Sequence, residues 1–286
     1  MTTDILVTGA TGFLGRVLVA TLEKNGHRVL RHSSAQGDIA RCRLPMENVG
    51  HVFHLAARTF VPDSWRCPQA FYETNVLGTV NVLEHCRQNG AALTFLSSYV
   101  YGVPQYLPIR EDHPVISFNP YAQTKILAET VARFYEQHHG LRVVVVRPFN
   151  LYGPGQAPFF LIPTLVGQML DASQSVVHVK DLRPKRDYLF IDDAVEMLLM
   201  TLRPEVRGTY NMGSGSSASV EEIGHLISQA AGVVKALVSE ESPRPNEIID
   251  TVADVSRAKA ALGWRPRTTL KDGIAAVVAA ARGARG

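Results

Sequence analysis

The sequence is poor in cysteine and in long hydrophobic runs. Its three cysteines, Cys42, Cys67 and Cys86, have neither metal-ligand nor Cys-x-x-Cys spacing, so we expect reduced thiols and no metal centre. No apolar run approaches the roughly 20 residues of a membrane span. Strand-like sequence begins by Asp4, which we interpret as leaving no room for a signal peptide. These absences favour a cytoplasmic protein with no membrane partner.

The sequence also lacks a dominant sign of charge. Its formal net charge is +3 over 286 residues, and the basic residues are scattered, so we expect no nucleic-acid partner. The apolar and charged fractions, 46% and 19%, are ordinary for a globular protein. The length suits one large α/β unit or one and a half domains.

Strand-like and helix-like segments alternate from the N-terminus onward. Unbroken Val-, Leu- and Ile-rich strands are typical of a parallel sheet with helices on both faces. We therefore predict an α/β fold, a doubly wound Rossmann sheet with a smaller C-terminal α/β lobe. We expect the dinucleotide-binding domain over 1–150 and about 186–213. The substrate lobe is expected over about 151–185 and 214–286, because a Gly-Pro-Gly loop follows residue 152.

A glycine-rich turn follows the first strand-like segment and opens a helical pattern. Glycines there allow a tight turn and let a pyrophosphate approach the helix N-terminus. The spacing is G-x-x-G-x-x-G and not G-x-G-x-x-G, which is a weak signal alone. Its strand–turn–helix context nevertheless favours dinucleotide binding. The expected contacts in this turn are Gly9, Thr11, Gly12, Phe13, Leu14 and Gly15.

The second strand-like segment ends without the acid that would hold an adenosine ribose 2′-OH. Arg31, Ser33 and Ser34 stand there instead, which favours NADP over NAD as the cofactor and leaves NAD open. Asp38 and Ile39 follow, and we expect them near the adenine. The next apolar strand ends in small residues that suit close approach of a cofactor, namely Leu55, Ala56 and Ala57.

The residues that we expect to carry the chemistry lie in two stretches, SSYVYG and NPYAQTK. Ser97, in the first, follows an apolar run and is expected at the exit of a buried strand. In the second, Asn119-Pro120 is typical of a helix start, and the helical pattern runs to about residue 138. Tyr121 and Lys125 are four apart, so they lie on one helix face, one turn from each other.

This arrangement predicts an acid/base set. A phenol has an unperturbed pKa of about 10, so it exchanges protons near neutral pH only if a neighbouring cation favours the phenolate. We predict that Lys125 supplies this charge to Tyr121 and that Ser97 hydrogen-bonds the same reacting oxygen. A Tyr-x-x-x-Lys pair also arises by chance, and a tyrosine in a first helical turn is more often a packing residue.

The chain resembles the extended short-chain dehydrogenases/reductases, in the branch of nucleotide-sugar epimerases, 4-keto reductases and dehydratases. The resemblance implies an NAD(P)-dependent enzyme whose partner is a nucleotide-diphosphate sugar, without identifying that sugar. The matching stretches run nearly from end to end: TGATGFLG at 8–15, HLAA at 54–57, NVLGT at 75–79, the two stretches above, RPFNLYGPGQ at 147–156, RDYLFIDDAV at 186–195, YNMGSGSSASVEEI at 210–223 and VSRAKAALGW at 255–264.

The resemblance also implies roles for individual residues. Tyr121 and Lys125 are the expected catalytic pair, Lys125 also holding the nicotinamide ribose, and Ser97 is the third member. Pro148 is expected against the nicotinamide, and Asn75 is expected to be structural. Guanidinium groups suit phosphate recognition. The positions expected to meet the substrate are Ser98, Tyr99, Asn150, Arg186 and Arg244.

One departure from the family pattern narrows the chemistry. In dehydratases of this group Asp-Glu usually follows the catalytic Ser/Thr, and this chain has Ser98-Tyr99. We therefore predict exchange of a hydride and a proton at C4 of a nucleotide-activated hexose. Reduction of a 4-keto-6-deoxy sugar is slightly favoured, because reductases draw on NADPH. A 4-epimerase with tightly bound NAD stays open, as do a reductase of hydrophobic ketones and a non-catalytic dinucleotide sensor.

Two further expectations concern helices. Relatives of this type often dimerise through helices that correspond to about residues 74–88 and 121–138, so we expect a homodimer. Ser219 and Glu222 have the spacing of a capping box, which predicts a helix start at this point.

Overall fold

The computed structural model of the chain describes residues 4–45, 48–241 and 248–284. Arg244, expected at the substrate, lies outside the described residues. The elements in chain order are β1 (Asp4–Thr8), α1 (Phe13–Lys24), β2 (Val29–His32), the 3₁₀-helix η1 (Ser34–Gln36), β3 (Val49–His54), α2 (Val61–Arg66), α3 (Pro68–Phe71), the π-helix η2 (Tyr72–Leu77), α4 (Gly78–Asn89), β4 (Ala92–Leu96), α5 (Pro120–His139), β5 (Val143–Pro148), β6 (Asn150–Tyr152), α6 (Leu161–Leu170), β7 (Val176–Val179), β8 (Lys185–Phe190), α7 (Ile191–Met200), β9 (Gly208–Met212), β10 (Ser217–Ser219), α8 (Val220–Ala231), β11 (Ala236–Ser239), α9 (Ser256–Leu262) and α10 (Leu270–Gly283).

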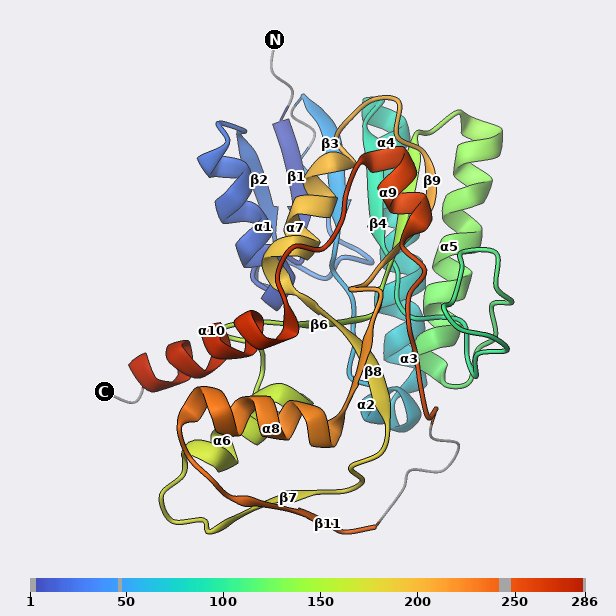
Figure 1. Cartoon of the computed structure of the whole chain (residues 1–286). Coiled ribbons are helices and arrows are strands. Elements are labelled where there is room, and N and C mark those ends of the chain that lie inside the picture. Colours follow the sequence, from blue (N-terminus) through green and yellow to red (C-terminus); the bar gives the residue numbers. More distant parts are fainter. Residues whose placement is uncertain (1–3, 46–47, 242–247, 285–286) are drawn as a thin grey trace.

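A six-stranded parallel sheet in the order β2-β1-β3-β4-β5-β9 forms the upper part of the molecule in Figure 1. This sheet confirms the predicted Rossmann-type α/β fold. β2 lies on one side of β1 and β3 on the other, so the direction of winding reverses at β1. Ligands of doubly wound sheets bind outside the carboxyl ends of the strands at this reversal. The loops after β1 and β3 therefore border the expected dinucleotide site.

Alternate residues of each strand face opposite sides of the sheet. Ile5 and Val7 of β1 belong to a core that also contains buried residues of α1 and α7. Leu6, between them, faces a second core, which α4 and α5 cover. Because both faces are buried, the strands read as continuous apolar runs and not as alternating ones.

The lower part of the molecule holds two small sheets, β10-β8-β6 and β11-β7, and the helices α6, α8 and α10 (Figure 1). The three helices pack on one another. β9 returns to the central sheet, so the chain passes between the two parts more than once. The division into domains near residue 150 stays a prediction. α8 begins with the predicted capping box, in which the Ser219 hydroxyl accepts from the Glu222 N–H.

The helix that carries Tyr121 begins where the sequence predicts. The Asn119 side-chain oxygen accepts a hydrogen bond from the Ala122 N–H at 2.7 Å, and Pro120 occupies the first helical position. Both features are typical of helix starts. Gly140, with φ of +66°, ends the helix in the left-handed conformation. α5 thus runs 20 residues, to His139, and presents Tyr121 in its first turn.

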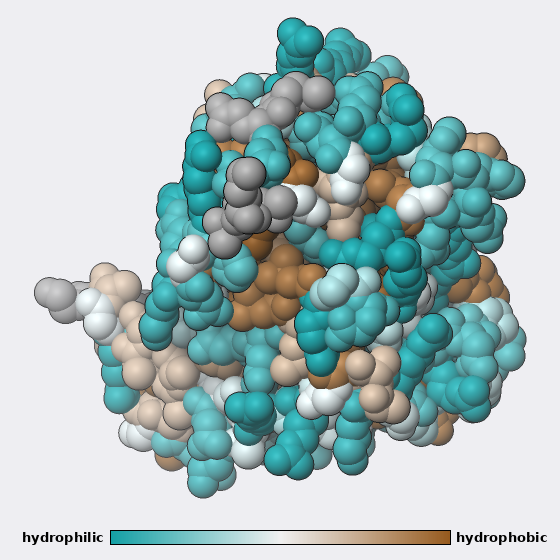
Figure 2. All heavy atoms as spheres, turned by 90° about the horizontal axis from the view of Figure 1, so that it is seen from above, coloured by the Kyte–Doolittle hydropathy of each residue, from teal (hydrophilic) through white to brown (hydrophobic). Residues whose placement is uncertain are grey.

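The face seen from above in Figure 2 is mostly hydrophilic, and hydrophobic residues gather in a hollow near its middle. Over the described ranges, no helix combines the length and the apolar composition needed to cross a membrane. Cys86 is fully buried, whereas Cys67 is exposed.

A buried histidine joins β3 to the elements beside it. His51 Nδ1 lies 3.1 Å from Arg142 Nη2, and His51 Nε2 lies 2.9 Å from the Thr94 hydroxyl. A guanidinium only donates, so Nδ1 accepts and Nε2 carries the proton. Burial lowers the pKa of His51 to about 3, and the charge of Arg142 acts in the same direction. The imidazole is therefore neutral in the folded chain at ordinary pH.

This burial predicts a specific loss of stability in acid. Below pH 6.5 the unfolded chain protonates His51 while the folded chain does not, so stability present above pH 6.5 is lost as the pH falls toward 3. Between pH 6 and pH 5, we expect the free energy of unfolding to drop by about 1 kcal/mol more in the wild type than in His51→Gln. Urea unfolding at each pH measures the slopes. His178→Gln, at an exposed histidine, should keep the wild-type slope, and an unchanged slope in His51→Gln would contradict the prediction.

Candidate active site

The loops after β1 and β3 approach each other so closely that the turn requires glycine. Gly9 has φ of +71°, and a Cβ placed on it would lie 2.8 Å from the Ala56 nitrogen. A Cβ on Gly15 would lie 2.1 Å from the Gly9 carbonyl oxygen. Side chains are thus excluded from the floor of the predicted dinucleotide site, where backbone approach to a pyrophosphate is needed.

The N-terminus of α1 suits a pyrophosphate in charge as well as in shape. Gly12 caps the 12-residue helix, no side chain caps it, and its first turn contains no acid. The first N–H groups and the positive end of the helix dipole therefore meet no competing protein anion in this turn. Thr11 and Gly12 are exposed, so an anionic ligand has access to this end. The described residues fit the phosphates of a dinucleotide.

A buried network fixes the backbone on the other side of this site. The Thr79 hydroxyl donates to the Asn75 carbonyl at 2.6 Å, so it accepts from His54 Nε2 at 3.1 Å. His54 Nδ1 then accepts from the Thr8 hydroxyl at 2.7 Å, and the same Thr8 oxygen accepts from the Ala56 N–H at 3.3 Å. Burial lowers the pKa of His54 to about 3, which keeps the ring in this neutral tautomer.

At the adenosine end, the structure gives the predicted residues local partners. Arg31 forms an ion pair with Glu23 of α1, with Nη2 2.6 Å from Oε1. Ser33 caps η1 together with Gln36. Ser34 and Asp38 are exposed, whereas Ile39 is buried. The residues from β2 through η1 contain no carboxylate, as the sequence shows, but Arg31 is engaged by Glu23.

Tyr121 and Lys125 lie one turn apart at the start of α5, on the side that meets β4. Lys125 is only 3% exposed, and its Nζ lies 4.4 Å from the centre of the Phe95 ring. Burial lowers the pKa of Lys125 to about 7, and the carboxylate of Glu129 acts in the opposite direction. Tyr121 is half-buried, with the Phe71 ring edge-on to it at 6.4 Å.

The serine beside Tyr121 differs from the predicted one. The Ser97 N–H bonds to the Val146 carbonyl, and the Ser97 hydroxyl donates to Glu129 Oε1 at 2.5 Å. The hydroxyl that is hydrogen-bonded to Tyr121 is that of Ser98. Ser97 still follows the ladder of β4, so its side chain points to the Glu129 side and the next residue points to Tyr121. In the structure the Ser97 hydroxyl is therefore engaged by Glu129, and its part at the reacting oxygen stays a prediction.

The protonation of Tyr121 also differs from the prediction. Burial raises the pKa of Tyr121, and the hydrogen bond with Ser98 acts in the opposite direction. In the structure desolvation dominates this pKa, so the direction of its shift is opposite to the predicted one, while the part of Lys125 in catalysis stays a prediction. The phenol is therefore protonated at neutral pH, as an unperturbed phenol also is.

The sequence reasoning missed an ion pair beneath this set. Glu129 binds Arg147 of β5 through two contacts, Nη2 to Oε2 at 2.6 Å and Nε to Oε1 at 3.0 Å. Both side chains are almost completely buried. Glu129 follows Lys125 by four residues, so the helical spacing that joins Tyr121 to Lys125 would also have identified Glu129.

Asn75 connects the catalytic helix to the loop after β3. It lies in the π-helix η2, a form often found at functional sites. Its amide accepts from the Arg58 N–H at 2.8 Å and donates to the Arg58 carbonyl at 3.1 Å. It also donates to Thr124 at 2.9 Å, and Thr124 bonds to the Tyr121 carbonyl. These contacts are structural, as expected for Asn75.

The predicted substrate residues gather where β5 leads into β6. The Asn150 amide donates to the Asp187 carbonyl at 3.1 Å, and Arg186 donates to the Ile248 carbonyl at 2.6 Å. Burial raises the pKa of Tyr99, and the nearby Arg186 charge acts in the opposite direction. Pro148 ends β5 two residues before Asn150. The structure thus brings Tyr99, Asn150 and Arg186 into one region.

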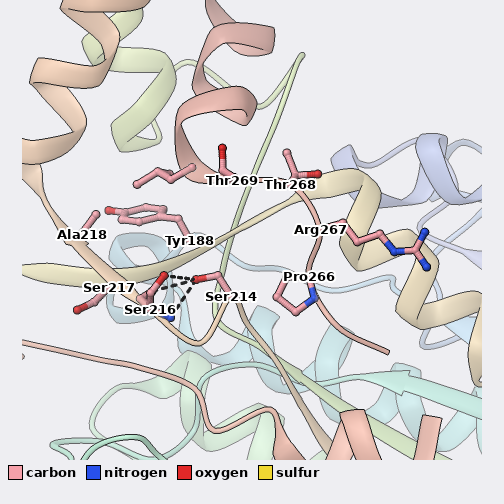
Figure 3. Close-up of a pocket in the computed structure, with 10 residues that line it drawn as sticks. Tyr188, Ser214, Ser216, Ser217, Ala218, Pro266, Arg267, Thr268 and Thr269 are labelled. Atoms are coloured by element: carbon pink, nitrogen blue, oxygen red, sulfur yellow. Dashed lines mark hydrogen bonds between the residues drawn. The ribbon is translucent and has the colours of Figure 1, made fainter. Parts of the chain in front are cut away.

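A cavity of about 340 Å³ lies between β8, β10 and the start of α10 (Figure 3). The Ser214 hydroxyl donates to the Ser216 carbonyl at its edge, at 2.9 Å. Tyr188 and Arg186 lie on the same face of β8. The cavity is therefore adjacent to the predicted substrate residues, while its lining includes neither Tyr121 nor Lys125. The lining residues are Tyr188, Ser214, Ser216, Ser217, Ala218, Pro266, Arg267, Thr268, Thr269 and Leu270.

Comparisons with known proteins agree with this geometry. The sequence model described as the NAD dependent epimerase/dehydratase family matches residues 5–213. The GDP-6-deoxy-D-mannose reductase of Pseudomonas aeruginosa is 32% identical over 97% of this chain and 97% of its own. A UDP-glucose 4-epimerase of Thermotoga maritima, solved with UDP-glucose, superposes with a TM-score of 0.92 at 27% identity over 99% of this chain and 100% of its own. RMD from Pseudomonas aeruginosa, solved with NADPH, gives a TM-score of 0.88 at 30% identity over 97% and 98% of the two chains.

The two serines are expected to respond differently to substitution. Ser98→Ala removes the hydroxyl on Tyr121 and should lower kcat about 100-fold, the usual cost of losing one donor at a reacting oxygen. Ser97→Ala removes a hydrogen bond to a buried carboxylate and should lower the free energy of unfolding by about 2 kcal/mol. In Ser97→Ala, kcat should stay within about threefold of wild type.

Steady-state kinetics and urea unfolding of both variants measure the two effects. Ser98→Ala should keep its stability within about 1 kcal/mol of wild type, because a single neutral hydrogen bond is lost. If Ser97→Ala lost catalysis and Ser98→Ala retained it, the part given to Ser98 would be wrong.

Proposed function

The chain belongs to the NAD dependent epimerase/dehydratase family, and from this membership we propose that it reduces a 4-keto nucleotide sugar with NADPH. The observation that carries the proposal is the placement of Tyr121, which is hydrogen-bonded to Ser98 and lies one turn from the buried Lys125. The protonated phenol can donate to a carbonyl oxygen. The missing carboxylate after β2 favours NADPH, and with it reduction over epimerisation.

The residues divide the proton chemistry among them. Tyr121 donates its hydroxyl proton to the C4 carbonyl oxygen of the sugar while Ser98 hydrogen-bonds that oxygen. Lys125, which has its pKa near 7, stabilises the phenolate that remains on Tyr121. When bound, the nicotinamide supplies the hydride to C4, so a carbonyl group becomes a carbinol and the cofactor is oxidised.

The substrate class rests on the polar residues beside this set. Asn150 and Arg186 lie on the paired strands β6 and β8. Arg186 is the proposed contact for the diphosphate, together with Arg244. The Thermotoga maritima relative was solved with UDP-glucose, and the Pseudomonas aeruginosa relative is a GDP-6-deoxy-D-mannose reductase. Both names support a nucleotide-activated hexose as the substrate of this chain.

The preference for NADP rests on the missing carboxylate. β2 ends at His32 and is followed by Ser33 and Ser34, at the position where an acid would repel a 2′-phosphate. RMD from Pseudomonas aeruginosa, solved with NADPH, supports the same cofactor. To contact a 2′-phosphate, Arg31 must break its ion pair with Glu23. This ion pair is exposed and therefore weak.

A second candidate is an NDP-sugar 4-epimerase that retains NAD. The ion pair between Arg31 and Glu23 favours it, because Arg31 is then unavailable to a 2′-phosphate. The Thermotoga maritima epimerase is also similar over the whole chain. The same Tyr121, Lys125 and Ser98 would serve both reactions, so the geometry of the acid/base set does not distinguish them.

Turnover with defined substrates distinguishes the two reactions. We expect the purified protein to oxidise NADPH in the presence of a 4-keto-6-deoxy nucleotide hexose, with NADH at least tenfold less effective in kcat/KM. Tyr121→Phe should reduce kcat by at least 100-fold, because the proton donor is lost. Interconversion of the C4 epimers of an ordinary nucleotide hexose without net consumption of NADPH would replace the reductase proposal with the epimerase.

The diphosphate contact has its own test. Arg186→Ala should raise KM for a nucleotide sugar about 10- to 100-fold, because a charged hydrogen bond contributes about 1.5–3 kcal/mol. Arg183 lies in the loop before β8 and pairs with Asp181. Arg183→Ala removes this charge and should leave KM unchanged. If Arg186→Ala turned over nucleotide sugars normally, a reductase of hydrophobic ketones would become the better proposal.

We propose a homodimer formed through α4 and α5. These two helices pack together, and Leu77 and Phe134 beside them are each more than half exposed. Phe134→Glu should shift the protein from dimer to monomer, because a charge at an apolar contact resists desolvation. Light scattering after size exclusion measures the mass, and a wild-type monomer at micromolar concentration would contradict the proposal.

A further inference from the structure

The 153–160 loop, between β6 and α6, contacts the start of α1, which follows the glycine-rich turn, and the loop after β3. It lies at the junction of the two parts of the molecule (Figure 1). Next to the glycine-rich turn, the side chain of Arg16 donates to the Gly155 carbonyl at 2.5 Å and approaches the Pro154 carbonyl at 3.4 Å. These contacts join α1, in the cofactor-binding half, to a segment that leads into the other half.

Glycine makes this contact possible. Gly155 has φ of +75°, and a Cβ placed on it would lie 2.2 Å from Arg16 Nη2. Gly153 packs tightly on Ile191, where an added Cβ would lie 2.5 Å from Cγ2, and it lies in van der Waals range of the ring of Phe13, the first residue of α1. The loop is thus seated on the first two turns of α1, next to Gly12 at the helix N-terminus.

The other end of the loop reaches the segment that follows β3. The ring of Phe159 lies 5.0 Å from the ring of Phe60, at an interplanar angle of 64°. Phe60 stands three residues after Ala57, in the stretch that borders the site opposite the glycine-rich turn. Such edge-to-face pairs stabilise an aromatic contact beyond its burial.

A segment held at one end by α1 and at the other by the loop after β3 spans the opening between them. We propose that the 153–160 loop is a gate over the dinucleotide site and that Arg16 is the positioning residue that keeps it closed. This inference rests on the proposed function only in requiring that a pyridine dinucleotide binds between these loops. All of the contacts that close the gate are between protein groups, so they act on cofactor uptake and on cofactor release alike.

The gate predicts an unusual kinetic signature in Arg16→Ala. Loss of one charge-assisted hydrogen bond, about 1.4 kcal/mol, corresponds to about tenfold in opening. Stopped-flow fluorescence with NADPH, or with NADH where NADPH does not bind, should show kon and koff both raised about tenfold. Kd should stay within about twofold. The gate opens and closes in both the free and the cofactor-bound protein, so easier opening raises both rates by the same factor.

Two variants serve as matched controls. Arg16→Lys keeps the charge but loses the planar fork that reaches two carbonyls, so its rates should fall between those of wild type and Arg16→Ala. Lys24→Ala removes an exposed charge from the end of the same helix and should leave both rates unchanged. Arg16 is itself exposed, and circular dichroism and thermal unfolding of Arg16→Ala should match wild type.

A second readout needs no cofactor. Phe159 and Phe160 are 58% and 40% exposed, and chymotrypsin cleaves after such residues when a loop opens. Arg16→Ala should be cleaved after Phe159 or Phe160 about tenfold faster than wild type, and Lys24→Ala at the wild-type rate.

The outcomes separate this inference from the proposed function. Unchanged kon and koff in Arg16→Ala would overturn the gate. A rise in koff alone, with Kd raised in proportion, would overturn it in favour of direct contact between Arg16 and the dinucleotide. If no variant bound a pyridine nucleotide, the proposed function would fail, and unchanged cleavage in Arg16→Ala would then reject the closed loop as well.

Discussion

The buried ion pair between Glu129 and Arg147 is the interaction on which the site depends most. Two charges that are almost completely removed from water are tolerated only because their contact is bidentate and further hydrogen bonds satisfy them. Removing one partner would leave an uncompensated buried charge, at a cost of about 3–5 kcal/mol. The pair fixes α5 to β5 and receives the Ser97 hydroxyl from the exit of β4. The helix that carries Tyr121 and Lys125 is thereby fixed against two central strands.

Lys125 and Glu129, one helical turn apart, lie in different environments because Arg147 binds Glu129. Lys125 lies in an apolar setting against Phe95, where burial lowers its pKa to about 7, and Glu129 partly opposes this shift. Because Arg147 engages both oxygens of Glu129, the carboxylate is held one turn from Lys125. A buried lysine one turn from a protonated phenol suits proton exchange with a sugar hydroxyl or carbonyl.

On the cofactor side, rigidity comes from neutral polar groups. His54 and its two threonine partners position the backbone at Ala56, and Asn75 links the following loop to the catalytic helix through Thr124. These groups are fully hydrogen-bonded and buried, so they specify one geometry at little electrostatic cost. The contrast with the exposed contacts of Arg16 is consistent with a rigid floor and a movable cover.

The sequence by itself determined the α/β class, the glycine-rich turn, the start of the helix at Pro120 with its end near residue 138, and the one-turn spacing of Tyr121 and Lys125. These features depend on local periodicity, capping and turn chemistry. It could not decide which of two adjacent serines faces Tyr121, since successive residues at a strand exit point to opposite sides and only the packed helix shows which side holds Tyr121. It could not show that Arg31 pairs with Glu23, or that Arg147, 18 residues beyond Glu129, lies beside it. It also predicted the wrong direction for the pKa of Tyr121, because desolvation is set by everything packed around a group and has no signature in spacing.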